Sequence, residues 1–233
     1  MRTAGQDELT HVHAVAACLC GFVLLARIGS ELIPQPFNAK IHPTAPSVAW
    51  VDLATTPAAD VTTAPLMQRI HMPRLAFRFK FGSLKQDQFL DKWNAATPAV
   101  ERTRRVSCAV DALLLLEALH GRDPDKPLFR VPAAYVRKML RERLAPLAPS
   151  GHVVTGHSLR YGGATALFAA GVRADIIARL GRWSTDQMVD LYARVDSAAA
   201  SAAIRAAVTG RRTTPFTALA TTGVPAAAAA EDA

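Results

Sequence analysis

Residues 9–33 contain a long apolar stretch, and it constrains the fold more than any other feature of the chain. Nearly every side chain in the run 14–26 is apolar, so a helix here has no polar face to turn toward water. The run is too short to span a bilayer and ends at Arg27. Asp7 and Glu8 stand where a signal peptide would carry positive charge. We therefore expect a buried helix over 9–33 at the centre of a core, and no membrane partner.

Two segments are typical of short β-strands. Residues 75–80 alternate apolar and basic side chains, and residues 49–53 form a second, shorter candidate. Between them, residues 55–65 are rich in Thr, Ala and Pro, which indicates a loop or insertion. We expect residues 82–83, a Gly-Ser pair, to turn the chain and residues 104–107 to return as a partner strand.

The remaining elements are predicted helices, several of them followed by glycine. Residues 108–120 carry apolar side chains at helical spacing and are closed by Gly121. Further helices are expected at 132–144, 158–170, 174–180, 185–194 and 197–208, with Gly171 and Gly181 as stop signals. Residues 209–233, rich in Thr and Ala, predict a weakly ordered tail. The fold class predicted is mainly α with a small antiparallel β-sheet.

The net charge indicates which class of partner the protein binds, and the cysteine content indicates the redox state of its compartment. The formal net charge is +8 and the pI about 9.9, which favours a polyanionic partner such as nucleic acid, although a basic soluble protein without one fits equally. Cys18, Cys20 and Cys108 form neither a disulfide framework nor a zinc pattern. A reducing, intracellular compartment is the simplest inference. The basic helix 132–144 is open to two interpretations, a solvated face or a surface that tracks phosphates.

His157 and Arg160 are the first candidate chemical groups. They stand three residues apart, so on a helix they share one face, and Gly156 lets the helix N-terminus approach an anion closely. A guanidinium grips two phosphate oxygens at once, and a histidine moves a proton near neutral pH. Two ordinary solvated residues would give the same short pattern.

Tyr192 is the candidate nucleophile, because a phenol attacks when nearby positive charge stabilises its anion; a packed tyrosine is the alternative.

Three further residues allow both a functional and a structural role. The indole N–H of Trp183 can donate to a phosphate oxygen, or the ring can pack between helices. Arg27 ends the apolar run, and Glu31 one turn later can hold it rigid, as a buried ion pair or as an oriented anion ligand. Lys85 lies in a polar turn after a strand, where it is either solvated or a general acid.

Considered together, these residues resemble the catalytic domain of the tyrosine recombinases, the phage-integrase family. The matching segments, in family order, are Leu24-Leu-Ala-Arg-Ile-Gly-Ser-Glu31, Ser83-Leu-Lys-Gln-Asp-Gln88, His157-Ser-Leu-Arg160, Leu180-Gly-Arg-Trp183 and Leu191-Tyr192. They supply an arginine, a lysine, a His-x-x-Arg box, a tryptophan in place of the commoner histidine, and the nucleophile. The resemblance implies the recombinase catalytic-domain architecture over residues 1–208, without the helical N-terminal domain that clamps DNA in family members.

The resemblance also implies a reaction: cleavage and rejoining of DNA strands through a 3′-phosphotyrosyl intermediate, with no metal or other cofactor. Arg27 and Arg160 would bind the non-bridging oxygens of the scissile phosphate, and Trp183 would add an N–H donor.

Three other residues would carry the proton transfers and the attack. Tyr192 would attack phosphorus, His157 would assist transfer of its proton, and Lys85 would protonate the departing 5′-oxygen.

Double-stranded DNA is the expected partner, with self-association into dimers or tetramers on it. The basic residues expected to contact phosphates are Lys80, Arg102, Arg104, Arg105, Arg137 and Arg141. The expected location is intracellular and DNA-associated, in the nucleus of a eukaryote or the nucleoid of a bacterium. Three alternatives stay open: an inactive DNA-binding remnant of a mobile-element recombinase, a type IB topoisomerase-like relaxing activity, and a basic helical protein-interaction module.

Overall fold

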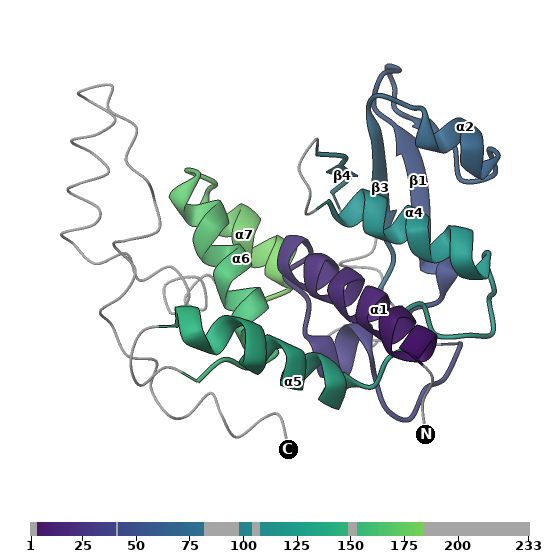
Figure 1. Ribbon diagram of the computed structural model, residues 1–233. Coiled ribbons are helices and arrows are strands. Elements are labelled where there is room, and N and C mark those ends of the chain that lie inside the picture. Colours follow the sequence, from purple (N-terminus) through teal and green to yellow (C-terminus); the bar gives the residue numbers. More distant parts are fainter. Residues whose placement is uncertain (1–3, 41, 82–97, 104–107, 149–152, 184–233) are drawn as a thin grey trace.

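The computed structural model describes residues 4–40, 42–81, 98–103, 108–148 and 153–183. In these ranges the chain is mainly helical with a small antiparallel sheet, as the sequence predicts (Figure 1). The elements are α1 (Ala4–Val23), η1 (Ile28–Leu32), η2 (Ala45–Ser47), β1 (Val48–Asp52), β2 (Ala59–Asp60), α2 (Leu66–Ile70), β3 (Leu75–Phe79), β4 (Val100–Glu101), α4 (Ala109–His120), α5 (Ala133–Leu144), η3 (Ala145–Leu147), α6 (His157–Ala169) and α7 (Ala174–Gly181). None of the helices in these ranges is both long and apolar enough to cross a membrane.

The sheet has four strands in the order β2-β1-β3-β4, and every pairing is antiparallel. Both long strands lie within one residue of their predicted positions, and Trp50 of β1 is paired with Phe77 of β3. The strand that pairs with the far edge of β3 is residues 100–101, whereas the predicted return strand 104–107 lies outside the described residues.

The predicted helix over 9–33 is wrong in its second half. Helix α1 ends at Val23, Leu25 adopts a left-handed φ of 48°, and the chain resumes as the π-helix η1. No proline or glycine stops the helix at this point. The carbonyls of Leu24 and Leu25 instead accept hydrogen bonds from arginine side chains that lie more than a hundred residues later in the sequence. Tertiary hydrogen bonding thus overrides the local preference for helix.

Helix α1 is central to the core, as predicted. It packs against α4, α5 and α6, and α4 lies between it and the sheet (Figure 1). Gly163 of α6 sets the closest approach, because a Cβ atom there would stand 2.3 Å from the carbonyl oxygen of Phe22. Trp183 and Ile177 form a smaller apolar cluster with Leu25 at this end of α1. The C-terminal end of α1 is therefore held rigidly against α6 and the residue after α7.

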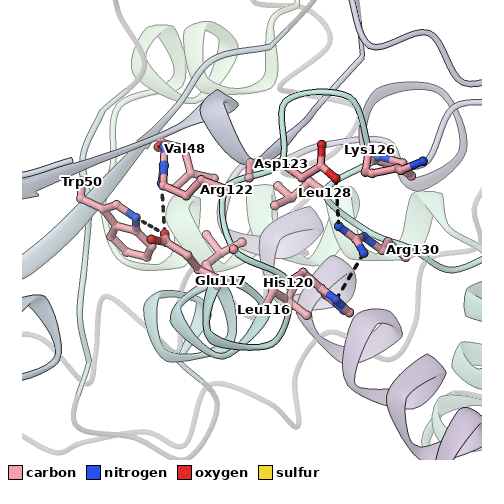
Figure 2. A pocket seen from close by; sticks show the side chains of 14 residues that line it. Val48, Trp50, Leu116, Glu117, His120, Arg122, Asp123, Lys126, Leu128 and Arg130 are labelled. Atoms are coloured by element: carbon pink, nitrogen blue, oxygen red, sulfur yellow. Dashed lines mark hydrogen bonds and ion pairs between the residues drawn. The ribbon is translucent and has the colours of Figure 1, made fainter. Parts of the chain in front are cut away.

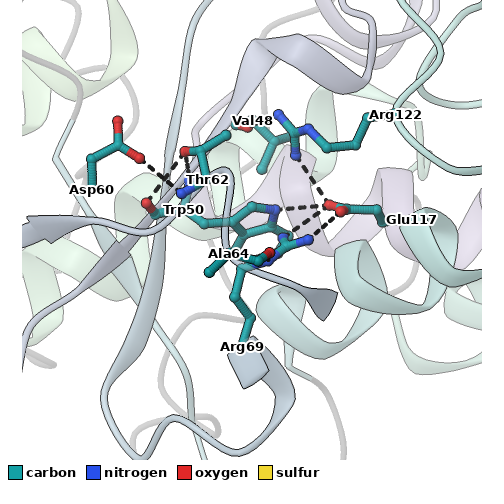
Figure 3. Close-up of polar contacts among 8 residues, drawn as sticks. All are labelled: Val48, Trp50, Asp60, Thr62, Ala64, Arg69, Glu117 and Arg122. Atoms are coloured by element: carbon teal, nitrogen blue, oxygen red, sulfur yellow. Dashed lines mark hydrogen bonds and ion pairs between the residues drawn. The ribbon is translucent and has the colours of Figure 1, made fainter. Parts of the chain in front are cut away.

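Glu117 fastens helix α4 to the sheet. Its carboxylate accepts the indole N–H of Trp50 at 2.8 Å and is ion-paired with Arg69 and Arg122, as Figure 3 shows. The guanidinium of Arg69 also lies over the Trp50 ring. Burial alone would raise the pKa of Glu117, but its hydrogen bonds to Arg69 and Trp50 and the arginine charges lower it. Because Trp50, Arg69 and Arg122 already occupy the carboxylate, Glu117 has a structural role in joining α4 to the sheet.

Candidate functional site

Glu31 gathers three arginines at the end of α1. Its carboxylate lies 3.6 Å from the guanidinium of Arg27, 3.6 Å from that of Arg160 and 2.7 Å from that of Arg182. It also accepts the backbone N–H of Arg27 at 2.9 Å. The Arg27–Glu31 pair is the one expected from the sequence, and the two arginines of the resemblance share the same carboxylate. We call Arg27, Glu31, Arg160 and Arg182 the arginine cluster.

The members of the arginine cluster differ in how much water they meet. The side chain of Arg27 is 31% exposed, whereas those of Arg160 and Arg182 are 1% and 8% exposed. The Nη1 atom of Arg160 donates to the carbonyl of Leu25 at 2.7 Å, and Nη2 donates to the carbonyl of Gly181. Arg27 is thus the member of the cluster most open to a ligand.

Arg182 occupies an unusual backbone position. It follows α7 with φ 54° and ψ 40°, its N–H reaches the carbonyl of Arg179, and the N–H of Trp183 reaches the carbonyl of Ala178. These bonds form a Schellman motif, in which glycine usually takes the left-handed place. A residue with a side chain costs about 1–2 kcal/mol there. The predicted stop at Gly181 is therefore wrong by one residue: Gly181 is the last residue of α7, and the Trp183 ring lies 2.8 Å from where a Cβ of Gly181 would stand.

The arginine cluster carries excess positive charge. Three guanidinium groups against one carboxylate leave +2. The carbonyl ends of α1 and α7, which Arg160 and Arg182 contact, each contribute about half a negative charge, so roughly one positive charge remains. Burial by itself would raise the pKa of Glu31, but Arg182, Arg160 and the Arg27 N–H and charge hold it below its ordinary value. A buried anionic carboxylate among three cations is an arrangement suited to a further, monovalent anion.

Trp183 packs against the arginine cluster, and His157 lies one helical turn before Arg160. The Trp183 side chain is buried, and its ring centroid lies 5.0 Å from the guanidinium carbon of Arg160. His157 is the first residue of α6, one turn before Arg160, and is partly buried. Thr155 and Ser158 close the N-terminus of this helix, because the N–H of Thr155 donates to the Ser158 hydroxyl at 3.0 Å. The structure thus brings Arg27, Arg160 and Trp183 together from the end of α1, from α6 and from the end of α7, and His157 lies one turn before Arg160 on α6.

The π-helix η1 is the scaffold on which these parts meet. Gly156, just before α6, packs on Ile28, since a Cβ at Gly156 would be 3.5 Å from the Ile28 side chain. The guanidinium of Arg137, from α5, lies 3.5 Å from where a Cβ of Gly29 would stand. Helices α5 and α6 therefore bring a basic side chain and a helix N-terminus to one five-residue turn. Such π-turns are frequent at functional sites.

The other predicted residues are spread more widely. Lys85, Tyr192, Arg104 and Arg105 lie outside the described residues. Arg141 is exposed on α5, and Lys80 is exposed just after β3. Arg102 is engaged in structural contacts, with a 2.6 Å hydrogen bond to the carbonyl of Ile70 and a 2.6 Å ion pair with Asp111.

A separate pocket opens at the C-terminal end of α4. Figure 2 shows Arg130 directed at Asp123 and His120 on one side, and Glu117 with Arg122 on the other. None of the predicted site residues lines this pocket. Its charged groups are mostly paired with one another, so the arginine cluster is the better candidate for chemistry.

Arg182 is the member of the site that the sequence analysis missed. In the sequence it belongs to the Leu180–Trp183 segment, in which a role is predicted only for Trp183. A usable signal exists: a charged residue stands between a glycine and a tryptophan directly after an amphipathic helix, and a charge buried at such a position needs a charged partner.

Neither a protein-family model nor a curated protein matches the chain. The resemblance to tyrosine recombinases therefore stays an expectation from the motif residues and their order.

Proposed function

We propose that the protein is a tyrosine recombinase that cleaves and rejoins DNA strands through a 3′-phosphotyrosyl intermediate. The observation that carries the proposal is the convergence of Arg27 and Arg160 on Glu31, with Trp183 stacked on Arg160. These residues are far apart in the sequence, and a chance motif match would give no reason for them to meet. The excess positive charge of the cluster suits a phosphodiester, which carries one negative charge.

The proposed reaction proceeds in two balanced transfers. The phenolic oxygen of Tyr192 attacks phosphorus, its proton passes to His157 or to water, and the bond from phosphorus to the 5′-oxygen breaks. Lys85 protonates the departing 5′-oxygen. A 5′-hydroxyl from a second strand then attacks the phosphotyrosine and releases the phenol, so the energy of the phosphodiester bond is retained throughout.

Arg27 and Arg160 support this reaction electrostatically. Both would hold the non-bridging oxygens, which gain negative charge in the pentacoordinate transition state. The partner in this proposal is double-stranded DNA, on which the protein forms dimers or tetramers within the cell. The basic face of α5 would contact phosphates beside the cluster.

Covalent trapping tests the proposal. The protein is incubated with a library of nicked duplexes of randomised sequence, and protein–DNA adducts that resist denaturing detergent are counted. Wild type should form adducts and Tyr192→Phe should form none. Adducts with Tyr192→Phe would refute the assignment of the nucleophile.

A second candidate is an inactive DNA-binding remnant of a recombinase. It is favoured by the burial of Arg160, whose two terminal nitrogens donate to the carbonyls of Leu25 and Gly181. In that case the wild type binds duplex DNA in a salt-dependent way and yields no adduct. Relaxation of supercoiled DNA without strand exchange would indicate the topoisomerase-like activity instead, and no binding at low salt would indicate a protein-interaction module.

A further inference from the structure

We infer that Arg182 is a positioning residue for the anion site: it neutralises Glu31 and locks the ends of α1 and α7, so that Arg27 and Arg160 keep their charge for a phosphodiester. The inference rests on the proposed function and adds a residue that the motif resemblance does not assign. Four observations carry it: the segments that Arg182 joins, its contact with Glu31, its backbone conformation and the charge of the site.

Arg182 contacts three segments that adjoin proposed catalytic residues in the sequence, namely Arg27, Trp183 and Lys85. Its Nη1 atom donates to the carbonyls of Leu24 at 3.1 Å and Leu180 at 3.0 Å. Its guanidinium carbon lies 3.9 Å from the ring centroid of Phe81, at the end of the strand segment that leads toward Lys85 in the sequence. One side chain therefore links the end of α1, the end of α7 and the segment after β3.

Arg182 makes the shortest charge contact with Glu31. The distance is 2.7 Å, against 3.6 Å for Arg27 and for Arg160. Arg182 also shares an acceptor with Arg160, because both donate to the carbonyl of Leu25, at 3.0 and 2.7 Å. Removal of Arg182 would leave Arg27 and Arg160 to neutralise the carboxylate by themselves.

The backbone of Arg182 indicates that the side chain is needed. Among the described residues, only Leu25 and Arg182 combine a side chain with a positive φ, and the Arg182 guanidinium is hydrogen-bonded to the Leu25 carbonyl. Glycine would satisfy the Schellman motif without strain. Strained backbone is maintained at functional sites when the side chain has a task there. Here the task is to join the two left-handed turns.

The charge of the site makes the inference testable. The arginine cluster carries +2 with Arg182 and +1 without it, and substitution of Glu31 by glutamine returns the value to +2. The glutamine amide oxygen still accepts the Arg27 N–H. A role through charge therefore predicts that Glu31→Gln rescues Arg182→Gly, whereas a purely structural role predicts that the two losses add.

Sulfate serves as the probe, because it presents phosphate-like oxygens and needs no catalysis. Thermal unfolding midpoints are measured as sulfate rises at constant ionic strength. Wild type should be stabilised by sulfate, Arg182→Gly should lose at least half of that rise, and Arg182→Gly with Glu31→Gln should regain it. Arg182→Lys, which keeps the charge, should retain the rise, and Arg179→Ala on the exposed face of α7 is the matched control. If Arg182→Gly does not fold, Arg182→Asn replaces it, since asparagine tolerates left-handed backbone.

Covalent trapping then extends the test to DNA. Arg182→Gly should form adducts at least about tenfold more slowly than the wild type, because Glu31 is then neutralised by Arg27 and Arg160 alone. An unchanged sulfate response in Arg182→Gly, a double variant worse than the single one, or a wild type that sulfate does not stabilise would each overturn the inference. Sulfate results as expected without any wild-type adduct would overturn the proposed recombinase function and leave the role of Arg182 standing.

Discussion

The imidazole ring of His13 stacks on that of His120, with the two Nε2 atoms 2.9 Å apart. The Nδ1 atom of His13 accepts the backbone N–H of Arg130 at 3.2 Å, which places the proton of a neutral His13 ring on Nε2, the atom that faces His120. Burial, then the charges of His120 and Arg130, lower the pKa of His13 to about 4. The contact joins α1 to α4, and a second proton on His13 would fall on Nδ1, against the backbone N–H of Arg130.

Acidification should therefore weaken the fold through this pair. The pKa of His13 is about 4 when folded and near 6.5 when unfolded, so the unfolded chain binds more protons in between. Stability is full above pH 6.5 and falls as the pH approaches 4, by up to roughly 3 kcal/mol. Urea unfolding at pH 7.5, 6.0 and 5.0 measures the fall. His13→Leu should show a shallower dependence, and an equally steep one would refute the assignment to His13.

Gly163→Ala should be strongly destabilising. The added methyl would stand 2.3 Å from the Phe22 carbonyl oxygen, and backbone on both sides prevents easy relief. Overpacking of this kind costs about 1–3 kcal/mol or more. Gly162→Ala is the matched control, because its methyl would lie 3.5 Å from the Phe22 ring and the change favours helix. Chemical denaturation of both variants measures the contrast; equal stabilities would contradict the close approach of α1 and α6.

Glu117→Ala should destabilise the protein by about 3–5 kcal/mol, because it leaves the buried guanidinium of Arg69 without its carboxylate. The indole N–H of Trp50 loses its acceptor at the same time. Glu101→Ala removes an exposed partner of Arg74 and should have no measurable effect. The free energies of unfolding in urea at pH 7.5 give the comparison, and similar losses in both variants would argue against a structural role specific to Glu117.

Binding to duplex DNA should weaken steeply with salt if α5 tracks phosphates. Arg141→Ala should reduce the slope of log K against log salt by about 1, since each phosphate contact releases counterions. Arg173→Ala, which removes an exposed arginine paired with Asp175 on α7, should leave the slope unchanged. Fluorescence anisotropy with a labelled duplex between 50 and 300 mM salt (roughly the range where the effect is largest) makes the measurement. A flat response in the wild type would contradict the proposed DNA interface.

Elements with a local stop signal could be predicted from the sequence. Helix α4 ends at His120 before Gly121 with φ 66°, and α6 ends before Gly171 with φ 80°, both as expected. The end of α1 could not be predicted in this way, because its cause is Arg160 and Arg182, which reach it only in the folded chain. The local sequence thus predicts helix ends that are set by glycine. It does not predict a helix end that is set by hydrogen bonds from residues far along the chain.

The candidate site shows the same division. The pairing of Arg27 with Glu31 follows from their spacing, and the structure contains it at 3.6 Å. The family resemblance implies that Arg160 lies near Arg27, but neither it nor the local pattern predicts that Arg160 shares the Glu31 carboxylate. Arg182 was missed because a positive φ at a residue with a side chain contradicts ordinary propensity. A residue that adopts a backbone conformation against its own propensity can be recognised only once its contacts in the folded chain are known.

The close approach at Gly163 has a consequence for how the site can change. The backbone of α6 at Gly163 lies directly against the Phe22 carbonyl of α1. The two helices therefore cannot slide past one another without a clash or a gap. Adaptation to a bound anion must then come from rotation of the Arg27 side chain, whose exposed fraction leaves it room to turn. The backbone of the site is therefore fixed, and the Arg27 side chain is the part of it that can turn.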